Sequence, residues 1–199
     1  MRKYWIWSGF IVLAVFTILI LVAFARPYTF HGSIFQPPLP APDFSLKNTN
    51  GQSFQLSQQK GRLVLLFFGY TNCPDECPAT LAVMKQVFAR LGSQSKRVNF
   101  VFITVDPQRD NPAQIRAFLA KYDSSFIGLS GSLAELTPVW KAYGVYQDLP
   151  INSSVTQYQV NHSTQVYLID PQGRLRITYT LDNSVDNIYQ DIQHIINEG

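Results

Sequence analysis

The chain has 199 residues, of which 46% are hydrophobic and 15% charged, and its formal net charge is +3. This length suits one globular domain with an additional short segment and leaves little room for two domains. The small charge, with no cluster of Lys and Arg, excludes a nucleic-acid surface of the usual basic kind. The charged fraction is low for a soluble domain, which indicates a concentrated apolar segment.

That apolar segment covers residues 5–24, which contain no charged residue. A helix of this length extends about 30 Å, the thickness of a bilayer's hydrocarbon core. Arg2 and Lys3 precede it, so the positive-inside rule puts the N-terminus in the cytoplasm and the rest outside. We predict an uncleaved single-pass anchor over residues 1–25 of a bacterial inner membrane protein, with the C-terminal domain in the periplasm. An A-x-A pattern at residues 23–25 leaves signal-peptide cleavage open.

A proline-rich stretch with little periodicity follows at residues 26–41. We predict a semi-rigid extended spacer there, in which His31 is solvated. The folded domain is predicted to cover residues 42–199.

Apolar runs alternate with amphipathic segments along this domain. The Asn50-Gly51 pair is typical of a hairpin turn. The continuous apolar runs at residues 63–68 and 98–105 are typical of buried parallel strands. A polar excursion at residues 147–161 is long enough to suggest a function. The predicted strands are residues 43–46, 53–56, 63–68, 98–105, 126–129, 165–170 and 175–180, and the predicted helices are residues 78–91, 111–122, 132–143 and 185–197. This order predicts an α/β sheet with a parallel half and an antiparallel edge.

The two cysteines, Cys73 and Cys77, lie between a predicted buried strand and a predicted helix. Sites in open α/β sheets form at this edge, and a helix N-terminus stabilises thiolate. Residues four apart on a helix are neighbours, so the two sulfurs can form a disulfide or chelate a soft ion such as Cu(I). A purely structural disulfide is the weaker interpretation, because so small a ring removes little unfolded-state entropy.

Three segments resemble the motifs of the Sco/SenC family. They are residues 69–78 (GYTNCPDECP), residues 105–112 (VDPQRDNP), and Asn161-His162-Ser163 followed by residues 166–173 (VYLIDPQG). The resemblance covers residues 41–199 and implies a thioredoxin-like fold. It also implies assembly of the CuA centre of cytochrome c oxidase subunit II, by copper donation, by reduction of the CuA cysteines, or both. A periplasmic copper donor and a thiol reductant are the further partners that such a role implies.

Carried over by position, the resemblance makes Cys73 and Cys77 thiolate ligands of Cu(I) or Cu(II) and His162 the third ligand. Asp106 falls where the family has an acidic residue thought to tune the site, although capping of a turn explains it equally well. Two departures, Asn72 where the family often has His and Asn161 where it often has Asp, affect the expected copper affinity.

Two other candidate donors have simpler explanations. Met84 is seven residues after Cys77 on the same helix face, which is the core face, so we predict core packing. His194 lies in the last predicted helix, where a surface or packing role is expected.

Three alternative functions remain open from the sequence. A membrane-anchored thiol–disulfide oxidoreductase without a metal is the first, although no proline lies between Pro150 and Pro171, where such enzymes place a cis-proline. A peroxidase is the second, although Tyr70 occupies the place of an expected threonine. A pure interaction module, in which the thiols do no chemistry, is the third.

Overall fold

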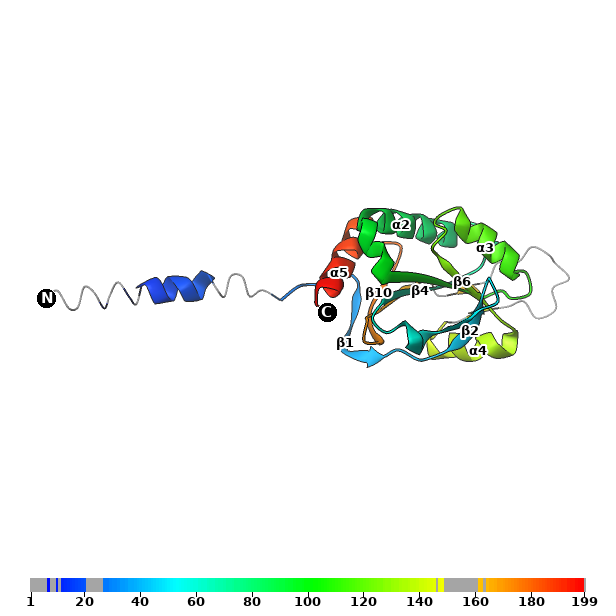
Figure 1. Ribbon diagram of the computed structural model, residues 1–199, viewed down its shortest axis with the longest axis horizontal. Helices are drawn as coiled ribbons and strands as arrows, with labels where there is room; N and C mark the ends of the chain where they lie inside the picture. The colour runs from blue at the N-terminus through cyan, green and yellow to red at the C-terminus, as the bar shows by residue number, and fades with distance from the viewer. Residues whose placement is uncertain are drawn as a thin grey trace.

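The computed structural model describes residues 7, 10, 12–20, 27–145, 147–148, 161–162 and 164–198. Within these residues, an eight-stranded sheet carries helices on both faces (Figure 1). Helices α2 (Glu76–Leu91), α3 (Pro112–Ala120) and α5 (Val185–Glu198) lie on one face, and α4 (Leu133–Ala142) covers the other.

Parallel strands form the centre of the sheet, and antiparallel strands flank them. The spatial order is β1-β10-β9-β4-β5-β6-β2-β3, in which β4, β5 and β6 run parallel. The bounds are β1 (Ser33–Pro40), β2 (Ser45–Asn48), β3 (Ser53–Gln55), β4 (Leu63–Gly69), β5 (Val98–Thr104), β6 (Ile127–Ser130), β9 (Val166–Ile169) and β10 (Arg174–Tyr179), with a separate ribbon of β7 (Gln147–Asp148) and β8 (Asn161–His162). The predicted parallel half, antiparallel edge and β2–β3 hairpin are confirmed.

Burial explains why β4 and β5 are so apolar. Every residue of β4 is buried, and only Asn99 of β5 is partly exposed. A strand covered on both faces needs an apolar side chain at each position, and each such side chain contributes about 1.5–3 kcal/mol. Helix α2 presents Leu81, Met84 and Phe88 to this core at three- and four-residue spacing. The predicted core packing of Met84 is confirmed.

The helix starts follow local capping chemistry. Asn111 caps α3 by accepting from the Gln114 backbone at 2.9 Å, and Ser132 and Glu135 form a reciprocal capping box on α4. Helix α2 begins two residues before its predicted start. Cys77 therefore lies inside the first helical turn.

The predicted spacer is corrected by the structure. Residues Ser33–Pro40 form β1, which pairs antiparallel with β10 from Ser33↔Thr178 to Pro40↔Arg174. The prolines are tolerated because β1 is an edge strand, where a missing N–H donor leaves no partner unsatisfied. The folded unit thus begins before the boundary expected at residue 42.

A buried carboxylate fastens the chain just before β1 to the last helix. Asp191 is 0% exposed and accepts from the Tyr28 hydroxyl at 2.8 Å, the Tyr179 hydroxyl at 3.1 Å and the His31 ring at 2.8 Å. The His194 ring stacks on Tyr28 at a centroid distance of 3.9 Å. His31 is exposed, as predicted, and it also pairs with Asp191. His194 has a packing role. We call Tyr28, His31 and Asp191 the N-terminal clasp.

We expect Asp191→Asn to lower the thermal unfolding midpoint by roughly 5 °C. The amide keeps one acceptor oxygen but loses the negative charge, so buried hydroxyl donors lose partners at a cost of about 2 kcal/mol. Near-ultraviolet circular dichroism of the full-length chain in detergent measures the midpoint. Asp182→Asn, a change of an exposed carboxylate on the preceding turn, is the control and should leave it unchanged. Equal midpoints for all three proteins would contradict the clasp.

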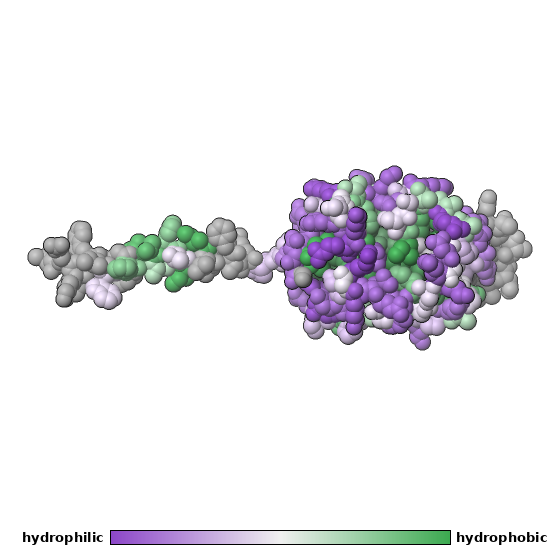
Figure 2. Space-filling view, in the orientation of Figure 1, coloured by the Kyte–Doolittle hydropathy of each residue, from purple (hydrophilic) through white to green (hydrophobic). Residues whose placement is uncertain are grey.

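Residues 12–20 form a helix with exposed apolar side chains, including Leu13 and Phe16. Figure 2 shows these apolar residues beside the largely polar surface of the folded domain. No helix among the described residues is both long and apolar enough to cross a membrane. The predicted span at residues 5–24 includes positions that lie outside the described residues.

Candidate metal centre

The cysteine loop begins where two central strands end. Gly69 and Thr104 are partners at the carboxyl ends of β4 and β5, and the Val105 N–H donates to the Gly69 carbonyl at 2.9 Å. The chain then turns, with the Cys73 N–H donating to the Tyr70 carbonyl at 3.3 Å. This is the edge at which sites of open α/β sheets are expected.

The two sulfur-bearing residues meet at the N-terminus of α2. The Cys77 backbone N–H donates to Cys73 Sγ at 3.4 Å, so the Cys73 sulfur lies over the first turn of the helix. Both residues are thiols; Cys73 is partly exposed, whereas Cys77 is 0% exposed. A helix N–H donor and the helix dipole both favour negative charge on the sulfur they face. The predicted proximity of the two thiols is therefore present in the structure.

The environment of Cys77 keeps its proton on. The hydrogen bond with Cys73 raises the pKa of the Cys77 thiol far above its ordinary value, and burial and the negative charge of Cys73 raise this pKa further. One sulfur is therefore available to react while the other holds a proton. Metal ligation by both thiols has to release that proton, because a metal binds thiolate.

Gly69 makes room for the buried sulfur. A Cβ atom at this position would lie 2.9 Å from Cys77 Sγ and 2.9 Å from the rings of Phe67 and Phe102. Real Cβ contacts are not this short, so only glycine lets the strand approach the sulfur so closely.

Asp106 follows β5 and is 0% exposed. Its carboxylate forms an ion pair with Arg109, whose guanidinium lies 5.7 Å from the centroid of the Tyr70 ring. Its backbone N–H donates to Thr104 Oγ1 at 2.9 Å. The acidic side chain beside the cysteine loop is thus tied to a cation, and Tyr70, buried at 2% exposure, lies under that cation.

The structure describes the backbone of His162. It pairs with Gln147 in the β7–β8 ribbon. The next strand, β9, pairs Val166 with Phe67, so the chain arrives at β9 beside the carboxyl end of β4 and hence beside the cysteine loop. The side chains of Asn161 and His162, and residues 149–160 of the predicted excursion, lie outside the described residues. In the part of the chain that is described, no three Cys, His, Asp or Glu side chains form a metal-binding group.

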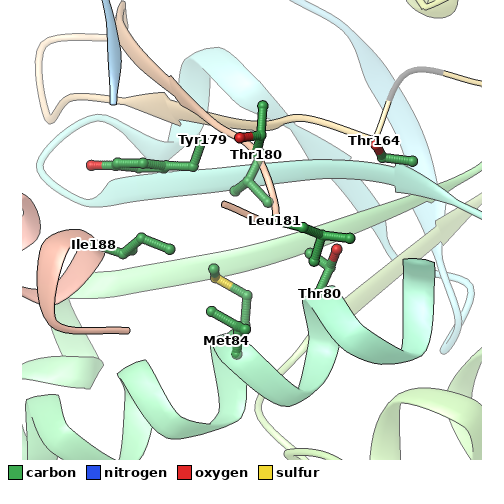
Figure 3. Close-up of a pocket in the computed structure, with 9 residues that line it drawn as sticks. Thr80, Met84, Thr164, Tyr179, Thr180, Leu181 and Ile188 are labelled. Carbon is green, nitrogen blue, oxygen red and sulfur yellow. The ribbon is translucent and has the colours of Figure 1, made fainter. Parts of the chain in front are cut away.

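A small apolar pocket lies further along α2 (Figure 3). Figure 3 shows Met84 facing Ile188 and Leu181 between α2 and the β10 end. The Met84 thioether belongs to this apolar lining, so it is a packing group, as predicted.

A hydrogen-bonded network of polar residues around the loop was not predicted from the sequence. Asp110 lies at 1% exposure and binds Thr71 of the cysteine loop and Thr104 of β5. The available signal was the Thr at a strand end followed six residues later by Asp, which is weak because such residues also cap ordinary turns.

The chain is similar to proteins of a known family over most of its length. The family model described as SCO1/SenC matches residues 36–197, which include both cysteines, Asp106 and His162. The chain belongs to the SCO1/SenC family. Among its relatives, a SCO2-like protein of Rickettsia felis is 34% identical over 74% of this chain and 73% of its own length. The mitochondrial SCO2 homologue of Mus musculus is 33% identical over 77% of this chain and 61% of its own length.

Solved Sco structures have the same fold. Copper-bound ScoI of Bradyrhizobium japonicum has a TM-score of 0.72 at 34% identity, covering 78% of this chain and 98% of its own. Copper-bound yeast Sco1 has a TM-score of 0.75 at 30% identity, covering 81% and 91%. These likenesses confirm the mixed α/β, thioredoxin-like fold.

Proposed function

We propose that this member of the SCO1/SenC family binds copper through Cys73, Cys77 and His162 and serves assembly of the CuA centre of cytochrome c oxidase subunit II. The observation that carries the proposal is the contact of the Cys77 N–H with Cys73 Sγ, together with the hydrogen bond between the two cysteine side chains, at a helix N-terminus. Solved relatives named as copper-bound support the choice of metal.

The donor set suits copper as cargo. Two thiolates select soft Cu(I), and an added imidazole also suits Cu(II). In the proposal, Cys73 is the entry ligand because its sulfur is partly exposed, and Cys77 joins by releasing its proton. Asn72 and Asn161 add no charge here, so the bound ion is balanced by the two thiolates, with Asp106 already paired to Arg109.

The proposed setting is the periplasmic side of a bacterial inner membrane, with residues 1–25 as the anchor. The uncharged run at residues 5–24 and the preceding Arg2 and Lys3 support this location. A periplasmic copper donor would load the site, and a thiol reductant would keep the pair reduced between cycles.

Unequal burial of the two thiols supports a second function, reduction of a partner's disulfide. The partly exposed Cys73 sulfur, as a thiolate, would attack one partner sulfur, forming a mixed disulfide and releasing the other as a thiolate that takes up a proton. Cys77, once deprotonated, would then attack Cys73 Sγ, giving the Cys73–Cys77 disulfide and the second partner thiol. Two electrons pass from the dithiol to the partner, in which two cysteines become reduced.

Copper titration tests the primary function. Full-length reduced protein, kept in detergent without oxygen, should take one Cu(I) from a colorimetric chelator. His162→Ala should weaken this affinity by at least about tenfold, since even outer-shell partners of metal ligands are worth about 10–100-fold. His194→Ala, which changes the histidine stacked on Tyr28, is the matched control and should bind as the wild type does.

Two results would count against the function. If the wild-type protein bound no copper, the proposal would fall and reduction of oxidised subunit II would be the function to measure. If His162→Ala bound as tightly as the control, His162 would not be a ligand.

A further inference from the structure

One buried carboxylate joins the cysteine loop to the neighbouring loop. The Asp110 carboxylate accepts hydrogen bonds from three donor groups of Thr71 and Thr104. The Thr71 N–H lies 3.1 Å and the Thr71 hydroxyl 2.5 Å away, and the Thr104 hydroxyl lies 2.7 Å away. The bonds from Thr71 span 39 residues of sequence and join two segments that follow adjacent strands.

Thr71 stands within the turn that sets the position of Cys73. The Cys73 N–H donates to the Tyr70 carbonyl across that turn at 3.3 Å, and the Cys73 sulfur then accepts from the Cys77 N–H. Both the backbone and the side chain of Thr71 are held by Asp110, so this residue of the turn has little freedom to rotate. Hydrogen bonds to a charged acceptor are the stronger kind, about twice a neutral one.

The other end of the network is equally fixed. Thr104 Oγ1 accepts from the Asp106 N–H at 2.9 Å while donating to Asp110. The Thr104 carbonyl accepts from the Trp140 indole N–H at 3.1 Å, which ties the strand end to α4. Asp110 therefore braces the cysteine loop against a rigid, buried part of the fold.

We propose that Asp110 is a positioning residue for the thiol pair, acting through Thr71 to hold the cysteine loop where Cys73 Sγ faces the N-terminus of α2. Asp110 touches neither sulfur in the described contacts and acts through the turn. This inference rests on the proposed copper function for its metal readout, and a second readout is independent of metal.

Copper affinity is the first readout. Asp110→Asn in the full-length protein should weaken Cu(I) binding by about tenfold, the lower range for groups that orient metal ligands. Asp170→Asn is the matched control, because Asp170 is also buried at 1% exposure and also accepts from backbone N–H groups, those of Gln172 and Arg174, at the β9–β10 turn. The control should lose thermal stability and keep its copper affinity.

Thiol selectivity in the metal-free protein is the second readout. In the wild type, an alkylating agent should modify Cys73 much faster than buried Cys77. Loosening the loop should reduce this ratio by about tenfold in Asp110→Asn, since the loop then covers Cys77 less well. Asp170→Asn should keep the wild-type ratio.

A pair of Thr71 variants covers the case in which Asp110→Asn fails to fold. Thr71→Val removes the hydroxyl bond to Asp110 and should reproduce both changes, and Thr71→Ser keeps the hydroxyl and should restore wild-type behaviour. If the wild type binds no copper but the selectivity changes as expected, the copper function fails and the positioning role stands. If selectivity and affinity in Asp110→Asn and Thr71→Val match the wild type, the positioning role is overturned.

Discussion

At pH 8, a small alkylating agent should label Cys73 of the reduced full-length protein about 100 times faster than Cys77, because thiolate is the reactive form and the Cys77 thiol is both buried and held protonated. The raised pKa of the Cys77 thiol should also change how the labelling rate of Cys77 depends on pH. An ordinary thiol approaches its full thiolate fraction above pH of about 9, whereas Cys77 labelling should still rise tenfold per pH unit at that point. Peptide mass spectrometry over time measures both rates.

Unfolding supplies the control for this result. In concentrated guanidinium the two cysteines should react at similar rates, since burial and the hydrogen bond between them are gone. Equal rates in the folded protein would show that Cys77 is accessible and that the order of reaction inferred from burial is wrong.

The second large effect is expected from Gly69→Ala. The added methyl would sit 2.9 Å from Cys77 Sγ and from two buried aromatic rings, and strand β4 is too tightly packed to move away. Overpacking of this kind costs about 1–3 kcal/mol of stability. Because one of the three nearest atoms is the sulfur of a proposed ligand, copper affinity should also fall, by about 100-fold at the upper range for displaced ligands.

A substitution at a second tightly packed glycine, Gly128, distinguishes a loss of stability from a loss of copper affinity. Gly128 in β6 would bring its Cβ against Ile115 and Leu119 of α3, and neither cysteine is among its nearest neighbours. Gly128→Ala should therefore lose stability, as read by thermal unfolding, while its copper affinity stays at the wild-type value. Equal losses of affinity in both variants would mean that general destabilisation, and not the sulfur contact, controls binding.

The central strands could be predicted because burial on both faces leaves a continuous apolar run, as in β4. The hairpin turn at Asn50-Gly51 and the capping residues of α3 and α4 could also be predicted, because each depends on only a few adjacent residues. Strand β1 was not readable, because its prolines resemble those of a spacer and only the pairing with β10 makes them a strand.

Some features of the candidate site could likewise be predicted from the sequence, and others could not. Cys73 and Cys77 could be found from their spacing and from the strand–helix context. The burial of Cys77 could not, because it depends on α2 beginning at Glu76 and on the close approach of Gly69. The role of Asp110 could not be found either, since its bond to Thr71 spans 39 residues and the local pattern of Thr104 and Asp110 is weak. The roles of His162 and Asp106 as ligand and tuning residue stay predictions.

The N-terminal clasp and β1 determine where a soluble fragment of this protein has to start. A fragment cut at residue 42, the boundary suggested by composition, would lack the edge strand that covers β10 and the two side chains that satisfy Asp191. The backbone groups of β10 would then be open to pairing with another chain, the usual route to aggregation. A fragment that begins at Pro27 keeps both features and is the natural starting point for crystallisation and for titration free of detergent.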